Sequence, residues 1–365
     1  MRCTLFGSSA PAAIPRSFSR QWPAWPVALA VTLLATVQAG STFATTVPTS
    51  TLLTFSTNMG SFQVDLFDQV VGATVNNFLG YVNSNAYQNT LVHRSVNATT
   101  EGIGVVQGGG YIVNSQSGTL THIATPTTTN LQYDLNNSVG TIAMARTSDP
   151  NSASSEWFIN TVDNSSSLGA ANGGGYAVFG QVMAGGMSIV NSIYALPKST
   201  VQGFPDFPLR NWSTGQAVGQ ANYVFTNNIT VVKSHPAFEN PNTPNDVNND
   251  GVLSPADALQ VINNLVTGHG PHTAAQVGLT YEYIDTNGDG TISASDALQV
   301  IHALVVQAQS NAQPASQEAS FSTVQEQVSP FFVTVPEPSA WVLATLGAAA
   351  VMGVALKRRH GLRAV

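Results

Sequence analysis

The sequence predicts a mainly β protein: a closed or nearly closed barrel of short strands, then a small helical domain and a C-terminal transmembrane helix. Three observations support this. Residues 50–235 are rich in Val, Thr, Phe, Gly and Asn and alternate between apolar and polar positions, as strands with one buried face do. Residues 246–308 instead repeat an acidic loop followed by helical spacing. A final apolar run is long enough to span a bilayer.

The composition limits the functions open to this chain. Of its 365 residues only 8% are charged, against roughly 25% in an average soluble domain, and 43% are hydrophobic. Lys and Arg gather near the two ends, so the body of the chain is acidic and predicts no nucleic-acid partner. The single cysteine, Cys3, lies in the N-terminal leader. A mature chain without that leader would have neither a disulfide nor a thiol nucleophile.

Residues 1–44 have the layout of a secretory signal peptide with a long basic leader. An apolar run covers residues 25–37, and small residues follow it, with cleavage expected after Ala39 or Ala44. An uncleaved membrane anchor is the alternative, which the shortness of the apolar run disfavours.

Local patterns predict individual elements of the barrel region. Residues 53–66 alternate as strand, turn and strand, with the bend at residues 58–60. Residues 70–82 have the spacing of a helix with one apolar face. The apolar positions of that helix are Val71, Val75, Phe78, Leu79 and Val82. The last strand is expected at residues 223–232, and the Pro- and Asn-rich stretch 234–245 marks a domain boundary.

Five blocks of the barrel region, in order along the chain, resemble the cyclophilin family. The blocks lie at residues 78–96, 106–111, 140–146, 154–160 and 176–182. Each block alone is a weak signal, whereas their ordered combination is specific. The resemblance implies that residues 50–235 form an eight-stranded antiparallel barrel capped by two helices, with peptidyl-prolyl cis–trans isomerase activity.

Isomerisation of an X–Pro bond makes limited demands on a site. Amide resonance opposes the rotation with a barrier of ~18–20 kcal/mol, so no nucleophile, acid–base pair or cofactor is required. The site needs an apolar pocket for the proline ring and a donor that favours a pyramidal imide nitrogen. The guanidinium of Arg94 suits the second role because it is always charged and offers a rigid fork of donors.

The resemblance implies that Arg94, Gln107 and Phe158 are the catalytic residues. Gln107 would hold Arg94 and the substrate backbone, and Phe158 would floor the proline pocket. The implied substrate-binding residues are His93, Val105, Ala145, Arg146, Glu156, Leu168 and Tyr176. The alternatives are that Arg94 is a solvated surface cation, that Phe158 belongs to the ordinary core, and that His93 is simply packed.

Several residues depart from the family pattern. Residues 97–106 form a connection about five residues longer than usual, without its large pocket-wall aromatic, for which Ile103 or Val105 would substitute. Glu156 replaces a common Gln and could pair with Arg94 or change the polarity of the groove. Ser167 replaces an aromatic before Leu168. These departures favour reduced catalysis, and the alternative function is a weakly catalytic module that binds Pro-containing segments in a surface assembly.

Residues 240–308 are predicted to form a small helical domain with two calcium sites. The same unit occurs at residues 246–257 and 285–296, with oxygen-bearing side chains at positions 1, 3, 5 and 12, Gly at position 6 and a backbone carbonyl at position 7. The predicted ligands are Asp246, Asn248, Asp250, Val252 and Asp257 in the first loop, and Asp285, Asn287, Asp289, Thr291 and Asp296 in the second.

The pair of loops, each followed by one helix, resembles dockerin type I repeats. That resemblance implies a cohesin-like partner, and a self-contained spacer is the alternative. Both helices have apolar residues at helical spacing, which are expected to bury against each other. These residues are Leu259, Ile262 and Leu265 in the first helix and Leu298, Ile301 and Leu304 in the second.

The C-terminal region is predicted to be a polar, flexible linker over residues 309–334 and a sorting signal over residues 335–365. The run from Ser339 to Leu356 would make about 27 Å of helix, enough to span a bilayer. Three basic residues follow it and would stay cytoplasmic. The pattern resembles the PEP C-terminal sorting signal of exported bacterial proteins, and a plain membrane anchor is the alternative. The chain is therefore expected to be exported to the cell envelope or surface, anchored at least transiently, with Pro-containing polypeptides as clients.

Overall fold

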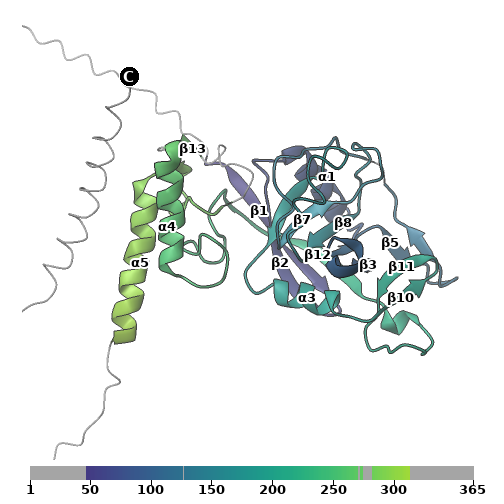
Figure 1. The fold of residues 1–365 in the computed structure, drawn as a ribbon. Helices are drawn as coiled ribbons and strands as arrows, with labels where there is room; N and C mark the ends of the chain where they lie inside the picture. Colours follow the sequence, from purple (N-terminus) through teal and green to yellow (C-terminus); the bar gives the residue numbers. More distant parts are fainter. Residues whose placement is uncertain (1–46, 126, 270–271, 274–281, 313–365) are drawn as a thin grey trace, which may run out of the picture. The chain divides into compact units, whose positions relative to one another are not determined.

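The computed structural model describes residues 47–125, 127–269, 272–273 and 282–312 (Figure 1). The predicted signal peptide, residues 313–334 of the predicted linker and the sorting signal lie outside these residues. The predicted start of the linker at residue 309 is wrong, because residues 309–312 belong to helix α5 (Ala294–Ala312). Among the helices that the structure does describe, none has the length and apolar character to cross a bilayer.

Eight strands form a closed antiparallel barrel, as the resemblance implies, in the order β1-β12-β3-β4-β8-β7-β9-β2. Their bounds are β1 Thr49–Thr57, β2 Gly60–Leu66, β3 Thr90–Val96, β4 Val105–Gly108, β7 Thr141–Met144, β8 Trp157–Asn160, β9 Val178–Val182 and β12 Phe225–Pro236. The first strand pairs along its whole length with the last one, from Thr49 opposite Pro236 to Thr57 opposite Thr226. The barrel therefore closes only when both ends of this region are in place.

Aromatic and branched side chains fill the barrel. Phe55, at 0% exposure, stacks on Phe62 at 5.1 Å between ring centroids and meets the edge of Trp157 at 5.4 Å. Two helices cover this core. Helix α1 (Gly72–Asn83) buries Val75, Phe78 and Val82, which confirms the predicted helix, and α3 (Met187–Tyr194) buries Val190 and Ile193.

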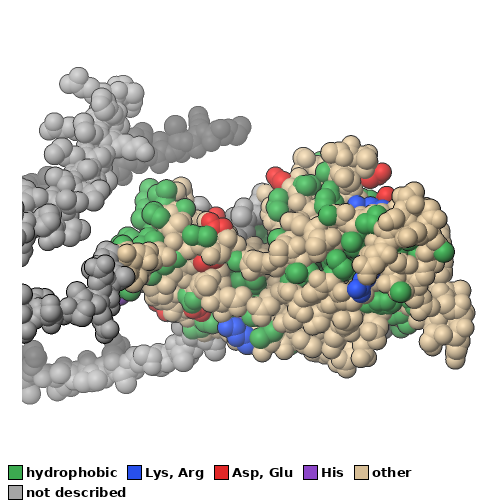
Figure 2. Space-filling model, turned by 90° about the horizontal axis from the view of Figure 1, so that it is seen from below, with side chains coloured by type: hydrophobic (Ala, Val, Ile, Leu, Met, Phe, Trp, Pro, Cys, Tyr) green, Lys and Arg blue, Asp and Glu red, His purple; other side chains and the backbone are tan. Residues whose placement is uncertain are grey.

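Short helices and strands lie in the connections between the barrel strands. They are α2 (Ala98–Glu101), β5 (Tyr111–Val113), β6 (Leu120–His122), β10 (Lys198–Val201), β11 (Phe204–Pro208) and η1 (Gln220–Asn222). A second small core of Leu91, Val201, Phe207, Leu209 and Tyr223 supports β10 and β11. On the face drawn in Figure 2 charged side chains are few, as the composition implies.

The repeat region contains α4 (Pro255–Asn264), η2 (Leu265–His269), α5 (Ala294–Ala312) and a two-stranded pairing of β13 (His272–Thr273) with β14 (Thr291–Ile292). Helix α4 begins with Pro255 at its first position. A reciprocal capping box joins Ser254 and Asp257, and it satisfies free backbone donors of the first turn.

The prediction that the larger apolar residues of these two helices are buried against each other is mostly wrong. Leu259 and Leu298 are 55% and 62% exposed, and Ile262 and Ile301 are exposed as well; only Leu265 and Leu304 are partly buried. The buried positions lie one residue earlier, at Ala258 and Val261 in α4 and at Ala297 and Val300 in α5. Small residues on that face allow close packing, and the larger side chains remain toward solvent.

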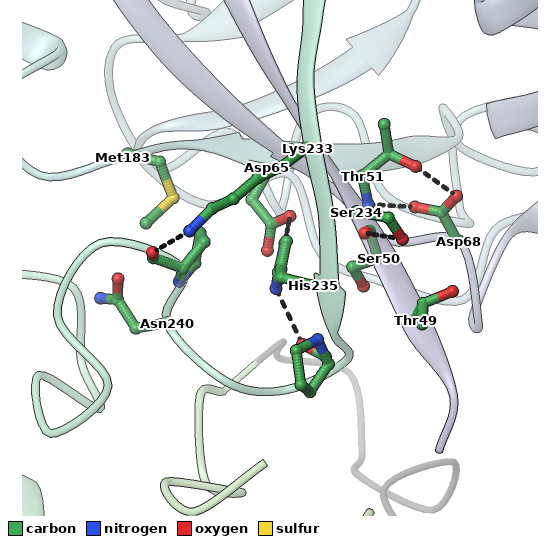
Figure 3. A network of polar contacts seen from close by, with 12 residues as sticks. Thr49, Ser50, Thr51, Asp65, Asp68, Met183, Lys233, Ser234, His235 and Asn240 are labelled. Atoms are coloured by element: carbon green, nitrogen blue, oxygen red, sulfur yellow. Dashed lines mark hydrogen bonds and ion pairs between the residues drawn. The ribbon is translucent and has the colours of Figure 1, made fainter. Parts of the chain in front are cut away.

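A buried polar pair, Asp65 and His235, joins strands β2 and β12 (Figure 3), and Tyr283 connects this pair with the repeat region. Asp65 is fully buried, and its Oδ1 lies 2.8 Å from His235 Nε2. The hydroxyl of Tyr283 donates to Asp65 Oδ2 at 3.0 Å and also lies 3.4 Å from the sulfur of Met183. Asn249 Nδ2 donates to the carbonyl of Val182 at 3.0 Å. Barrel and repeat residues thus share both polar contacts and one hydrophobic core.

Candidate active site

A cavity of ≈ 140 Å³ opens on the side of the barrel where β3, β4 and β8 run next to one another. Its lining residues are Arg94, Ile103, Val105, Gln107, Ala145, Arg146, Phe158, Leu168 and Tyr176. All three residues predicted to be catalytic and five of the seven predicted to bind substrate are among them. His93 and Glu156 are the two predicted residues that do not line this cavity.

Strand register explains why distant residues meet here. In the antiparallel pairs, Arg94 of β3 lies opposite Gln107 of β4, and Gln107 lies opposite Phe158 of β8. Directly paired residues project to the same face of a sheet, so the three side chains form one row. Arg94 Nη1 donates to Gln107 Oε1 at 3.3 Å. The guanidinium is therefore held at the rim of the cavity.

The apolar floor of the cavity is made by Phe158, which is 4% exposed and meets the Tyr176 ring edge-to-face at 5.6 Å. Arg146 lies over the Tyr176 ring, with its guanidinium carbon 4.4 Å from the ring centroid. Its Nε and Nη2 donate to the carbonyl of Gly175 at 3.0 and 2.9 Å. Arg146 thus fastens the wall of the cavity with most of its donors already used.

The long connection after β3 supplies the rest of the wall. It folds as the short helix α2, capped by the Asn97 side chain, and then brings Ile103 and Val105 to the cavity. Asn164 fixes this segment: it accepts from the Gly104 N–H at 3.0 Å and donates to the Gly104 carbonyl at 2.9 Å. This asparagine was not predicted, because a single Asn in a loop belongs to no sequence pattern.

Replacing Asn164 by alanine is expected to lower both stability and turnover. The substitution leaves the Gly104 N–H unpaired in a buried place, at a cost of about 1–3 kcal/mol, while the Gly104 carbonyl keeps its hydrogen bond from the Thr161 N–H. It also frees Ile103 and Val105 to move, so KM for a proline peptide should rise. Urea unfolding and steady-state kinetics measure the two effects. Asn191→Ala, on the exposed side of α3, is the matched control, and equal behaviour of the two variants would contradict the role.

Glu156 lies just before β8 and is engaged by residues other than Arg94. Gln107 Nε2 donates to its Oε2 at 2.8 Å, while His93 Nε2 lies 3.2 Å from Oε2 and His122 Nε2 lies 3.3 Å from Oε1. Burial alone would raise the pKa of Glu156, but the hydrogen bonds and charge of its partners, His93 foremost, outweigh burial and lower the pKa. His122, in the β5–β6 hairpin, was not predicted.

A second hollow of ≈ 330 Å³ continues from the first and shares Gln107, Ala145 and Arg146 with it. Tyr111, His122, Thr147, Ser152, Ser154 and Glu156 complete its lining. An extended peptide could therefore place one residue in the apolar cavity and a neighbouring residue against this polar wall.

The two acidic loops adopt matching conformations. Asp246 and Asp285 accept from the backbone of Asp250 and Gly251 and of Asp289 and Gly290 respectively, and both glycines have positive φ, at 87° and 83°. Within the described residues no group of three or more His, Cys, Asp or Glu side chains is gathered closely enough to hold a metal ion.

The charges of these loops nevertheless fit a hard cation. Burial, followed by the charges of Asp296 and Asp289, raises the pKa of Asp285 to about 6. Burial, followed by the charges of Asp257 and Asp250, also raises the pKa of Asp246. Crowded carboxylates with few compensating cations are the ligands that Ca²⁺ favours. The donor set therefore suits calcium.

The closed barrel and its arginine-edged apolar pocket define the class of protein, and the comparisons give the family. The model of "Cyclophilin type peptidyl-prolyl cis-trans isomerase/CLD" matches residues 52–212. The peptidyl-prolyl cis-trans isomerase of Acinetobacter baylyi is 35% identical over 164 residues, which cover 44% of this chain and 82% of that relative. Isomerase A of Dickeya dadantii is 36% identical over 184 residues, covering 50% and 90%. Isomerase B of Escherichia coli is 37% identical over 145 residues, covering 39% and 83%.

The chain belongs to the cyclophilin-type peptidyl-prolyl cis–trans isomerase family, which confirms the resemblance and the enzyme class it implies. Two further matches lie beyond the barrel. Residues 244–305 match the dockerin type I domain, and residues 334–359 match the PEP-CTERM protein-sorting motif. Both confirm the resemblances seen in the sequence.

Proposed function

We propose that this chain is an exported prolyl isomerase that acts on X–Pro bonds of extracytoplasmic proteins, with Arg94, Gln107 and Phe158 as its catalytic residues. One observation carries the proposal: a guanidinium and a glutamine amide on paired strands face an apolar cavity floored by a phenylalanine. The remaining lining residues, Val105, Ala145, Arg146, Leu168 and Tyr176 among them, would contact the substrate.

The geometry suggests how the barrier is lowered. The proline ring enters the apolar cavity over Phe158, which excludes water from the imide. Rotation about the C–N bond makes the imide nitrogen pyramidal and gives it a lone pair. Arg94 can donate to that lone pair, and the planar ground state offers it no such acceptor. The contact therefore stabilises the transition state more than the substrate.

A coupled isomerisation assay on the full chain tests this assignment. We expect clear acceleration of a Pro-containing test peptide by the wild type, and a loss of about a hundredfold in kcat/KM in Arg94→Ala, the cost of one such donor. Arg210→Ala is the charge-matched control, because Arg210 is not among the residues that line the cavity. Full activity in the Arg94 variant would refute the role of Arg94.

A second candidate function is a binding module with little turnover. Part of the cavity wall is aliphatic, formed by Ile103 and Val105 on the lengthened connection. An aliphatic wall can hold a proline ring while positioning the bond less firmly. Saturable binding of a proline peptide without acceleration, in a protein that unfolds cooperatively, would favour this candidate.

The repeat region is proposed to bind two calcium ions and a protein partner. Asp246, Asn248, Asp250, Val252 and Asp257 would hold one ion, and Asp285, Asn287, Asp289, Thr291 and Asp296 the other. Calcium would neutralise the carboxylates and order both loops, as hard cations do. The exposed residues Leu259, Ile262, Leu298 and Ile301 repeat between α4 and α5 and offer an apolar surface to a cohesin-like partner. The sorting motif at residues 334–359 supports export and envelope attachment.

A further inference from the structure

Glu156 occupies a place that the surrounding backbone leaves open for it. At Gly110, in the turn between β4 and β5, a Cβ atom would lie 2.5 Å from Glu156 Cγ and 2.7 Å from its Cδ. Any other residue at this position would push the carboxylate away. The glutamate side chain is only 22% exposed, so its position is set by the protein more than by solvent.

The partners of Glu156 decide which way round the amide of Gln107 lies. An amide has a donor end and an acceptor end, a guanidinium has only donors, and a carboxylate has only acceptors. The Gln107 NH₂ group faces Glu156 Oε2 at 2.8 Å, and its oxygen faces Arg94 Nη1 at 3.3 Å. If the amide were rotated by 180°, its NH₂ group would face the Arg94 donors and its oxygen would face the Glu156 oxygens, and neither pair could form a hydrogen bond.

His93 and His122 fix the carboxylate from two further elements. His93, on β3, is 3% exposed, and its Nδ1 has no partner among the described residues, so the proton belongs on Nε2, which faces Glu156. His122, at the end of β6, places Nδ1 2.7 Å from the Ile123 carbonyl and Nε2 against Glu156 Oε1. Gln107 and His93 therefore donate to the carboxylate and His122 lies beside it, and none of the three is Arg94.

We propose that Glu156 is a positioning residue of the isomerase, acting on Arg94 only through the orientation of the Gln107 amide. The contact chain runs Glu156, Gln107, Arg94, and ends at the cavity rim. It rests on the proposed role of Arg94 in the isomerase. It replaces the direct pair with Arg94 that the sequence left open for Glu156, because the side chains that contact this carboxylate are Gln107, His93 and His122.

A double-mutant cycle on the full chain tests the proposal. We expect Glu156→Ala to lower kcat/KM about tenfold, the effect of one misplaced hydrogen bond, mainly through kcat. Gln107→Ala should lower it by a similar factor, and the double variant no further, because both changes break the same chain. Losses that multiply in the double variant would overturn the proposal.

Two further measurements distinguish a positioning role of Glu156 from a general loss of structure: the activity of the conservative variant Glu156→Gln and the NMR signal of the Gln107 side chain. Glu156→Gln keeps an acceptor for the Gln107 NH₂ group and should restore most of the activity. The ¹⁵N–¹H signal of the Gln107 side-chain amide should move in Glu156→Ala and return toward the wild-type position in Glu156→Gln. If Glu156→Ala does not fold, Glu156→Ser is used, since serine is too short to reach Gln107.

The Gln107 side-chain amide signal also distinguishes failure of the proposed isomerase function from failure of the positioning role of Glu156. A wild type without isomerase activity would sink the proposed function, while a shifted Gln107 signal in Glu156→Ala would still support the orienting contact. An unmoved signal would overturn the positioning role whatever the activity of the wild type. Glu101→Gln, an exposed carboxylate on α2, is the matched control and should leave both readouts unchanged.

Discussion

Replacing His235 by alanine is expected to lower the free energy of unfolding by about 3–5 kcal/mol, the usual cost of leaving one member of a buried ion pair alone. Asp65 is fully buried, and His235 is its only basic partner among the described residues. Without the imidazole the carboxylate keeps one hydrogen bond, from Tyr283, inside the shared core. Urea unfolding at neutral pH in calcium-containing buffer measures the loss.

The contribution of the Asp65–His235 pair to stability should decrease as the pH rises. Burial alone lowers the pKa of His235, but the hydrogen bond and charge of Asp65 outweigh burial and raise the pKa. A raised pKa means that the folded state favours the protonated ring. The contribution is therefore complete below the unfolded-state pKa of about 6.5 and is lost as the pH rises through the higher folded-state value.

Two variants check that assignment. His302→Ala removes an exposed histidine on α5 and should leave the free energy of unfolding almost unchanged. Asp65→Asn removes the charge that raises the pKa of His235, so the loss of stability above neutral pH should shrink. If His235→Ala unfolds at the same urea concentration as the wild type, the pair contributes nothing to stability.

Eight of the ten site residues named from the sequence line the cavity. Register explains part of this result: once β3, β4 and β8 are adjacent, it places Arg94, Gln107 and Phe158 in one row. The other lining residues include Ala145, Arg146, Leu168 and Tyr176, which lie in loops that no register fixes. The ordered family blocks carry this information even though no single block does.

Contacts between single polar residues far apart in the chain could not be predicted. Asp65 and His235 are 170 positions apart, and Asp65 and Tyr283 are 218 apart. No periodicity or motif marks such pairs, and burial decides them. Similarly, His122 reaches Glu156 from the β5–β6 hairpin, 34 positions earlier in the chain.

The helix faces show a different limit of pattern analysis. Both α4 and α5 have two apolar stripes one residue apart, and hydrophobicity favours the stripe with the larger residues. The structure buries the other stripe, Ala258 with Val261 and Ala297 with Val300, and leaves Leu259 and Leu298 exposed. Hydrophobicity along the sequence does not tell which of two adjacent stripes faces the core, because that depends on the neighbouring elements.

Removing calcium is expected to destabilise the repeat region by about 4 kcal/mol, the linkage free energy when the ion stands near 1,000 times its dissociation constant. Without the cation the carboxylates of the second loop stay close together without a counter-charge: burial first, and then the charges of Asp296 and Asp289, raise the pKa of Asp285 to about 6. Thermal unfolding with calcium and with a chelator measures the difference. Asp246→Ala combined with Asp285→Ala should reproduce the chelated value in calcium, and identical melting with and without the ion would contradict the calcium sites.

The effect of calcium should extend into the barrel, because the two regions share contacts. Tyr283 precedes the proposed ligand Asp285 by two residues and donates to Asp65 of β2, and the Asp285 N–H donates to the Phe238 carbonyl at 3.0 Å, just beyond β12. Disorder in the second loop would loosen these contacts. Amide exchange should therefore speed up at the ends of β2 and β12 when calcium is chelated, and Tyr283→Phe should weaken that response. Unchanged exchange in both strands would show that the repeats stabilise only themselves.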